Sequence, residues 1–86
     1  MALGYHVHFT RHAREKFIVL KRHAFPVTEK EVLAAVSRPD RLDHTRSPLV
    51  IAQRRIRKHH VLRVVYKVSG RDSMTIITFY PGRRAE

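Results

Sequence analysis

Apolar residues recur at helical spacing in the first third of the chain. They follow one another at intervals of four, three and four residues and so share one stripe of a helix, formed by Ala13, Phe17, Leu20 and Ala24. Thr10 is suited to cap the start of this helix, and Pro26 ends it. The pattern predicts an amphipathic helix whose other faces are mostly basic.

A second helix is predicted from its start signal. Thr28 followed by Glu31 has the spacing of a capping box, in which each side chain accepts a hydrogen bond from the backbone N–H of the other residue. Pro39 conflicts sterically with a helical residue before it, so the helix covers about residues 29–37. Its buried face is expected to contain Val32, Leu33 and Val36.

The second half of the chain has the pattern of a sheet. β-Branched residues collect in Leu49–Ile56, Val61–Val68 and Met74–Tyr80, and a weaker alternation at residues 5–9 indicates a short strand before the first helix. Helices followed by strands and short loops predict a single α+β domain over residues 1–86. We expect two N-terminal helices to pack on one face of a three- to four-stranded antiparallel sheet.

The alternation within Val61–Val68 predicts how the two faces of this sheet differ. Its apolar residues share the face turned to the helices: Leu62, Val64, Tyr66 and Val68. Arg63 and Lys67 lie on the opposite face, which the helices leave uncovered. That face is therefore expected to be free to bind a partner.

The chain is strongly basic, which indicates the kind of partner. It has 18 Lys and Arg against 7 Asp and Glu, a formal net charge of +11 on 86 residues. Seven of the ten residues in Arg54–Arg63 are Arg, Lys or His, at a predicted connection between strands. Positive charges this close together repel one another unless a polyanion binds them. Nucleic acid is the leading candidate for that partner.

Several other classes of protein are disfavoured. Without cysteine there is no disulfide framework, so a reducing cytoplasm is the simplest compartment. The apolar runs fall far short of the roughly 20 residues of a membrane span, so we expect a cytoplasmic protein with no membrane partner. Asp40, Asp43 and His44 form the only local acidic cluster, which is more typical of a turn. We therefore expect neither a metal site nor a cofactor.

Cleavage of RNA without a metal requires a base, an acid and fixed positive charge beside the phosphorus atom. Histidine can serve as base or acid near neutral pH, and arginine matches phosphate oxygens with a planar fork. The candidates for this chemistry are His12, Arg54, Arg63, Tyr80 and Arg83. Each also has a purely structural alternative, such as a surface histidine or a tyrosine at the edge of the core.

Four segments, in the same order, resemble the family known as domain of unknown function 4258. Phe9–Lys16 resembles its opening helix S/T-x-H-A-x-x-R, and Thr28–Asp40 resembles its second helix T-x-E-E-V-x-x-A-L-x-x-P-D. Leu62–Tyr66 matches its strand L-R-V-V-Y, and Ile76–Pro81 is similar to its closing V-V-T-V-Y-P. The resemblance covers nearly the whole chain.

This family is similar to the RelE, ParE and BrnT toxins, which implies metal-free cleavage of RNA restrained by an antitoxin. The resemblance favours His12, Arg63 and Tyr80 as catalytic residues, because they fall within matching motifs. Lys16 stands where the family more often has arginine, and lysine lacks the bidentate fork. The nucleic-acid-binding residues predicted with them are Arg11, Arg14, Lys16, Arg54, Arg57, Lys58 and Arg83.

Three functional hypotheses remain open at this stage. The first is the toxin of a toxin–antitoxin pair, an endoribonuclease that cleaves RNA, free or on the ribosome, and is restrained by an acidic antitoxin protein. The second is a noncatalytic nucleic-acid-binding or regulatory module that uses the same positive face. The third is an interaction domain whose target is a protein such as gyrase or a dedicated acidic partner. The charged strands carry few aromatic residues, which argues against a reader that stacks single-stranded bases.

Overall fold

The computed structural model describes residues 6–83 of the chain. Within this range the elements follow one another in the order β1 (His6–Phe9), α1 (Arg11–Arg22), α2 (Glu29–Ser37), β2 (Arg41–Asp43), β3 (Val50–Arg57), β4 (His60–Gly70) and β5 (Ser73–Arg83). The α+β class and both helices agree with the sequence pattern, and α2 has the predicted bounds. No helix among these residues is both long enough and apolar enough to cross a bilayer.

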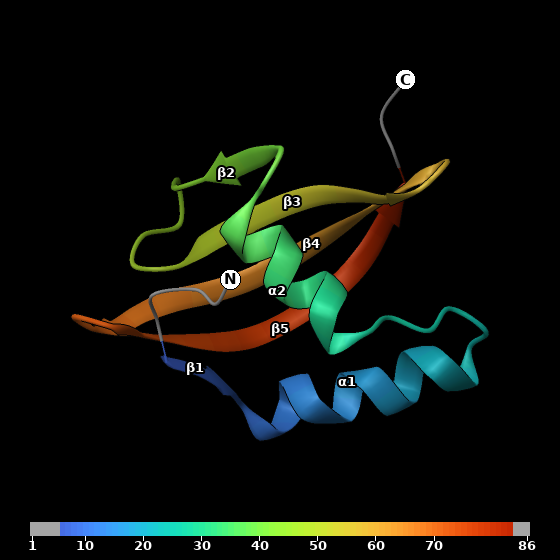
Figure 1. The fold of residues 1–86 in the computed structure, drawn as a ribbon, viewed down its shortest axis with the longest axis horizontal. Coiled ribbons are helices and arrows are strands. Elements are labelled where there is room, and N and C mark those ends of the chain that lie inside the picture. Colours follow the sequence, from blue (N-terminus) through green and yellow to red (C-terminus); the bar gives the residue numbers. More distant parts are fainter. Residues whose placement is uncertain (1–5, 84–86) are drawn as a thin grey trace.

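The strands form one sheet with the order β1-β5-β4-β3-β2 (Figure 1). The expected antiparallel sheet of three or four strands is wrong in two respects. β1 precedes the helices and pairs in parallel with β5, and β2 extends the opposite edge. Apolar alternation can indicate a strand, but it does not specify the partner or direction of that strand. β2 has only three residues, of which Leu42 alone is apolar, so it produces no alternation signal.

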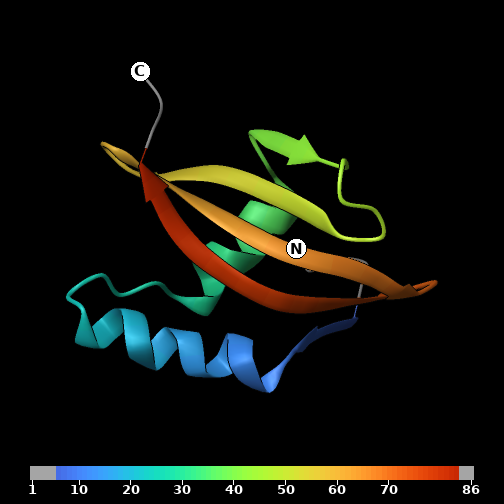
Figure 2. The same ribbon diagram turned by 180° about the vertical axis from the view of Figure 1, so that it is seen from behind.

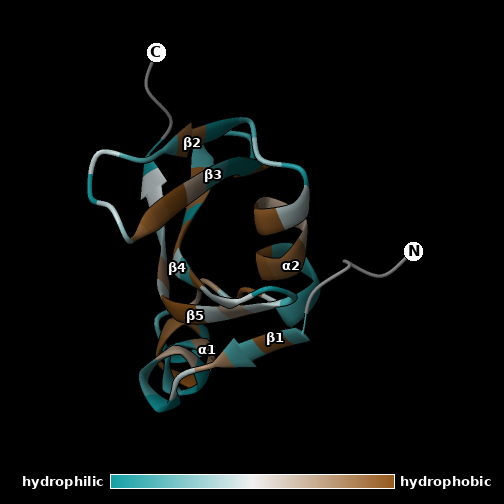
Figure 3. Ribbon diagram, turned by 90° about the vertical axis from the view of Figure 1, so that its left-hand side faces the viewer, coloured by the Kyte–Doolittle hydropathy of each residue, from teal (hydrophilic) through white to brown (hydrophobic). Residues whose placement is uncertain are grey.

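The two helices pack against different strands of the sheet. α2 crosses β3 and β4, whereas α1 runs beside β5 (Figures 1 and 3). Seen from behind, the long strands lie in front of the helices, so this second face has no helical cover (Figure 2). We call it the open face. The fully buried side chains of largest volume lie between the layers and are Phe79, Leu62, Ile76, Val32 and Val64.

The alternation predicted for β4 is confirmed over most of its length. Leu62, Val64 and Tyr66 are buried on the side of the helices. Val68, which was expected to continue this face, is 56% exposed. Its cross-strand partner Met74 is only 3% exposed, so the exposure at this end of the hairpin is on the β4 side.

Thr10 starts α1 and also anchors it to the sheet. Its Oγ1 accepts a hydrogen bond from the backbone N–H of Ala13 at 3.0 Å and donates to the carbonyl of Ile77 in β5 at 2.8 Å. Ala13 and Leu20 of the predicted stripe are buried, and Phe17 is half-buried. The cap therefore determines which side of α1 faces the core.

Ala24 does not belong to the buried stripe as predicted. The helix ends at Arg22, and Ala24 is exposed with φ of 60°. The N–H of Ala24 donates to the carbonyl of Lys21, and that of Phe25 donates to the carbonyl of Leu20, which is the bonding pattern of a Schellman motif. Its left-handed position usually holds glycine, since a Cβ is disfavoured there.

The capping box of α2 forms as predicted and joins a longer-range contact. The Thr28 N–H donates to Oε1 of Glu31, the Glu31 N–H donates to Oγ1 of Thr28, and Nη1 of Arg57 lies 2.9 Å from the other Glu31 oxygen. Burial raises the pKa of Glu31, but the Thr28 amide and Arg57 outweigh it and leave that pKa below its ordinary value. One carboxylate thus links the start of α2 to the end of β3.

Replacing Ala24 with glycine is expected to stabilise the fold. The substitution relieves a left-handed conformation that costs an L-residue about 1–2 kcal/mol, partly offset by the greater freedom of glycine in the unfolded chain. A net gain of about 1 kcal/mol would raise the melting temperature by about 4–8 °C. Calorimetry measures this directly. Ala34→Gly, inside α2, is the control and should lower the melting temperature. A lower melting temperature for Ala24→Gly would contradict the assignment.

The Glu31 contacts should make stability depend on pH in the acid range. A lowered folded-state pKa contributes stability above the unfolded value of about 4.5 and loses it as the pH falls through the folded value. We expect Glu31→Gln to be less stable than the wild type at pH 7 by about 1 kcal/mol or less. Urea titrations across pH 7 to 2 should show the two proteins converging in acid.

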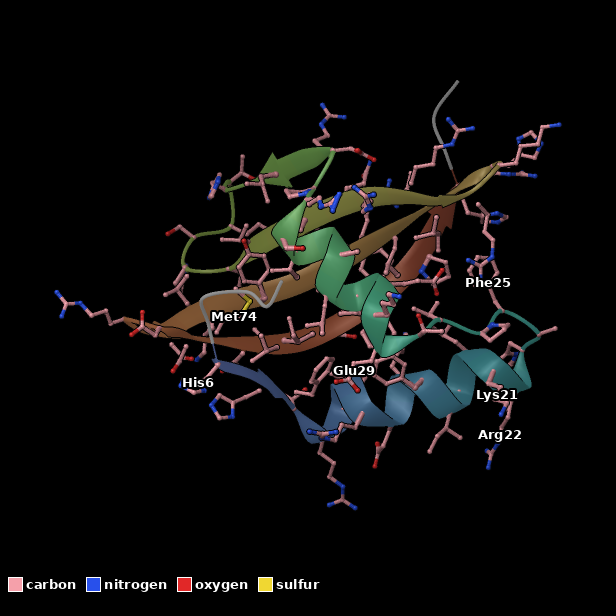
Figure 4. All side chains as sticks on the ribbon, viewed as in Figure 1. His6, Lys21, Arg22, Phe25, Glu29 and Met74 are labelled. Atoms are coloured by element: carbon pink, nitrogen blue, oxygen red, sulfur yellow. The ribbon has the colours of Figure 1, made fainter. Side chains whose placement is uncertain are left out.

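Glu29→Gln is the matched control for this titration. Glu29 lies in the same helical turn, at the start of α2 (Figure 4), and its side chain makes no hydrogen bond or ion pair with other residues of 6–83. Because Glu29→Gln removes a charge near the helix N-terminus but no side-chain contact, the stability of this variant should stay close to that of the wild type. A constant difference between Glu31→Gln and the wild type across the whole range would refute the ionic contribution.

Candidate nucleic-acid interface

The sheet register places four polar side chains in one row across the open face. Arg41 of β2 pairs with Gln53 of β3, Gln53 with Arg63 of β4, and Arg63 with Tyr80 of β5. Residues directly opposite each other on neighbouring strands have Cβ atoms about 4.5–5.5 Å apart. Residues far apart in the sequence therefore form one continuous polar strip.

A cleft of about 490 Å³ lies over this row, between the strands and the loop that follows β2. Its walls are formed by Arg41, Leu42, Asp43, His44, Thr45, Arg46, Ile51, Gln53, Arg63 and Tyr80. Three arginines face a single aspartate, so the cleft is positively charged. Nucleic-acid phosphate is a ligand that matches both this charge and the donor-rich walls.

Arg63 is held in a defined position on the open face. Its Nε donates to Oε1 of Gln53 at 3.0 Å. Its guanidinium group lies against Gly82, where an added Cβ would overlap Nη1 and stand 2.9 Å from Cζ. Among residues 6–83, no acceptor bonds Nη1 or Nη2. Gln53 and Gly82 therefore orient a fork whose outer edge is available to a phosphate.

The structure brings together two of the three predicted catalytic residues. Arg63 and Tyr80 are cross-strand partners in the cleft. His12 does not line it. The His12 Nε2 lies 3.1 Å from Oγ1 of Thr78, and Thr78 shares a face of β5 with Tyr80 because one residue separates them. His12 thus stands beside β5, at the margin of the open face.

Two predicted nucleic-acid-binding arginines of β3 lie on the wrong face for this cleft. Arg54 alternates with Gln53, points to the helices and donates from Nη1 to the carbonyl of Arg38 at 2.6 Å. Arg57 bonds Glu31 and the carbonyl of Pro26, and it lies 5.1 Å from the centre of the Phe25 ring. Both side chains serve the packing of the helices on the sheet, which a count of charges along the sequence does not reveal.

The other predicted binding residues are dispersed. On α1, Arg11 pairs with Glu15, Arg14 lies 5.5 Å from the centre of the Phe9 ring, and Lys16 is half-exposed. Lys58 is exposed in the turn between β3 and β4, and Arg83 is exposed at the end of β5, opposite His60. None of these five side chains lines the cleft. They lie on α1 and at one end of the sheet, outside the cleft.

The acidic cluster noted in the sequence takes part in local backbone contacts. Asp40 accepts a hydrogen bond from the Arg55 N–H, and Asp43 accepts two from Thr45. Across residues 6–83, no three His, Asp or Glu side chains lie close enough together to hold a metal ion.

Part of the cleft was not predicted from the sequence. Gln53 could have been predicted, because side chains alternate along β3. Val50 and Ala52 face the core, so Gln53 lies on the opposite face. The sequence gives no comparable signal for Arg41, His44 and Arg46. A strand of three residues and the loop after it are too short or irregular to show a repeating pattern of apolar and polar residues. Their position beside Arg63 depends on the pairing of β2 with β3.

Comparisons with known proteins add no relative from which a role could be transferred. No family model matches the chain, no curated protein matches it, and no solved structure matches it.

Proposed function

We propose that this protein is a toxin-like endoribonuclease that cleaves RNA without a metal ion, with the cleft on the open face as its active site. The observation that supports this most is the pairing of Arg63 with Tyr80 across β4 and β5, inside a cleft lined by three arginines. The resemblance of Phe9–Lys16 and Leu62–Tyr66 to a toxin-like family points in the same direction.

The chemistry assigns different tasks to these two residues. The Arg63 fork holds the nonbridging oxygens of a phosphodiester and stabilises the negative charge that grows at phosphorus during displacement. A phenol is a proton donor at neutral pH, so Tyr80 protonates the departing 5′-oxygen. Arg41 and Arg46 hold flanking phosphates along the wall formed by β2 and its loop.

The same charge suggests how the activity is restrained. An acidic antitoxin segment lying over the cleft would neutralise its arginines and exclude RNA. Such binding would also stabilise a small basic domain by mass action.

A noncatalytic nucleic-acid-binding module is the second candidate, and one observation favours it. His12, the imidazole expected to move a proton, contacts Thr78 and lies outside the cleft. Under this alternative Arg63 and its neighbours bind phosphate, but no bond is broken.

Arg63→Ala separates the two candidates when RNA is incubated with pure protein in EDTA. If the cleft is catalytic, the wild type cuts a labelled RNA, either free or on ribosomes, and the variant loses about 10²–10³-fold in rate, as expected for removing one charge-stabilising donor. The slope of log K against log salt should also become shallower by about 0.7 for the lost phosphate contact. Denaturing gels and binding titrations measure the two effects.

Lys67→Ala is the matched control, because Lys67 lies on the same face of β4 but does not line the cleft. It should cleave at close to the wild-type rate. Intact RNA with the wild-type protein under all these conditions would reject the nuclease proposal, and undiminished cutting by Arg63→Ala would remove Arg63 from the site.

Gly82→Ala tests whether the position of Arg63 matters as well as its presence. The new methyl group takes the place of Nη1, so the flexible guanidinium group must move while the fold is retained. We expect slower cleavage, with Arg63→Ala plus Gly82→Ala no worse than Arg63→Ala alone, because both changes act on one group. Gly70→Ala is the control, since its Cβ would meet only Ser73 atoms, at 3.5 Å or more. Independent losses in the double variant would contradict this account.

A further inference from the structure

The cleft contains an imidazole that the sequence analysis did not select for catalysis. Among the described residues that line it, His44 is the only histidine, and it lines the same space as Arg63 and Tyr80. It follows directly after β2, in the loop that forms one wall. His12 was favoured by motif and by position on a helix, whereas His44 is brought to the cleft by the pairing of β2 with β3.

The backbone around His44 is held by hydrogen bonds on both sides. Oδ1 of Asp43 accepts from the Thr45 N–H at 2.8 Å and from the Thr45 hydroxyl at 2.6 Å. The Ser47 N–H donates to the His44 carbonyl at 3.3 Å. These contacts form an Asx-type turn, which limits the directions in which the imidazole can point.

The charges that surround His44 are suited to proton transfer. The titratable and charged groups lining the cleft with it are Arg41, Asp43, Arg46, Arg63 and Tyr80. The Thr45 hydroxyl and amide hold the pKa of Asp43 below its usual value despite some desolvation, with smaller contributions from Arg46 and His44. Asp43 therefore stays ionised beside His44 and can stabilise an imidazolium ion once it forms.

His44 and Tyr80 stand on opposite walls. Tyr80 is on β5 and His44 follows β2, with β4 and β3 between them. Neighbouring strands are about 4.8 Å apart, so the backbones of Arg41 and Tyr80, which share one row, are separated by about 14 Å. His44 lies three residues beyond Arg41, and both His44 and Tyr80 line the space between. A phosphodiester held by Arg63 would have one proton-transfer group on each side. In-line displacement at phosphorus requires this arrangement, because the attacking and departing oxygens lie on opposite sides.

We propose that His44 is the general base of the cleft and Tyr80 its general acid, an assignment that rests on the proposed nuclease function. The His44 imidazole takes the proton of the 2′-hydroxyl, and the 2′-oxygen forms a bond to phosphorus. The bond from phosphorus to the 5′-oxygen breaks, and that oxygen takes the phenolic proton of Tyr80. The products are a 2′,3′-cyclic phosphate and a 5′-hydroxyl end. Water then removes the proton from the imidazolium ion and returns one to the phenolate.

The test compares His44→Ala with the wild type and with Arg63→Ala, using a short RNA in EDTA. We expect His44→Ala to lose about 10²–10⁴-fold in turnover while its affinity for uncleaved RNA changes little. The wild-type rate should rise with pH as the general base loses its proton, and this limb should vanish in the variant. Added imidazole should restore part of the turnover of His44→Ala, which a purely structural role would not allow.

Two further variants make the result specific. His8→Ala removes an exposed imidazole on β1, away from the cleft, and should retain the wild-type rate and pH profile. His44→Gln keeps a polar side chain in the loop and should be as inactive as His44→Ala if proton transfer is what is lost. Circular dichroism verifies that each variant is folded.

The outcomes distinguish this inference from the function on which it depends. If the wild type cuts RNA, Arg63→Ala does not, and His44→Ala cuts at the wild-type rate, the nuclease stands and His44 is not its base. Loss of activity in His12→Ala alone would likewise transfer the role to His12. A wild-type protein that leaves RNA intact would reject the nuclease and the assignment of His44 together.

Discussion

The register of β3, β4 and β5 is the constraint on which both the core and the cleft depend. Side chains alternate along a strand, so a slip of one residue would turn Leu62 and Val64 to solvent and bury Arg63 instead. Burial of each large apolar side chain contributes about 1.5–3 kcal/mol, and an unpaired buried charge costs several more. The apolar face under the helices therefore maintains the pairing of Arg63 with Tyr80 on the open face.

Positive charge has two distinct uses in this small domain. Arginines on the helix side hold the layers together, as Arg57 does by bonding Glu31 and Arg54 by bonding the end of α2. Other cationic side chains point into the solvent. Lys21 and Arg22, at the end of α1, project away from the sheet (Figure 4). Charge by itself does not mark the site. The cleft combines concavity with an oriented guanidinium group, an imidazole and a phenol.

The parts of the fold that were predicted correctly are those encoded locally. The caps at Thr10 and Thr28 depend on residues within one helical turn. The three long strands were predicted from alternation within about eight residues. The parallel strand β1 could not be assigned to β5, because that edge joins groups such as Thr10 and Ile77, which are 67 positions apart. Ala24 was misplaced because a Schellman ending can place an alanine where the helical period still fits.

Composition and the periods of 3.6 and 2 residues are enough to predict the net charge, the two helices, the three long strands and the exposed side of Arg63. Which cations lie together depends on the pairing of the strands. This pairing sets Gln53, Arg63 and Tyr80 in one row, brings His44 to their cleft, and turns Arg54 and Arg57 toward the helices. It joins residues that are far apart in the chain, and no local pattern of residues records which strands will pair.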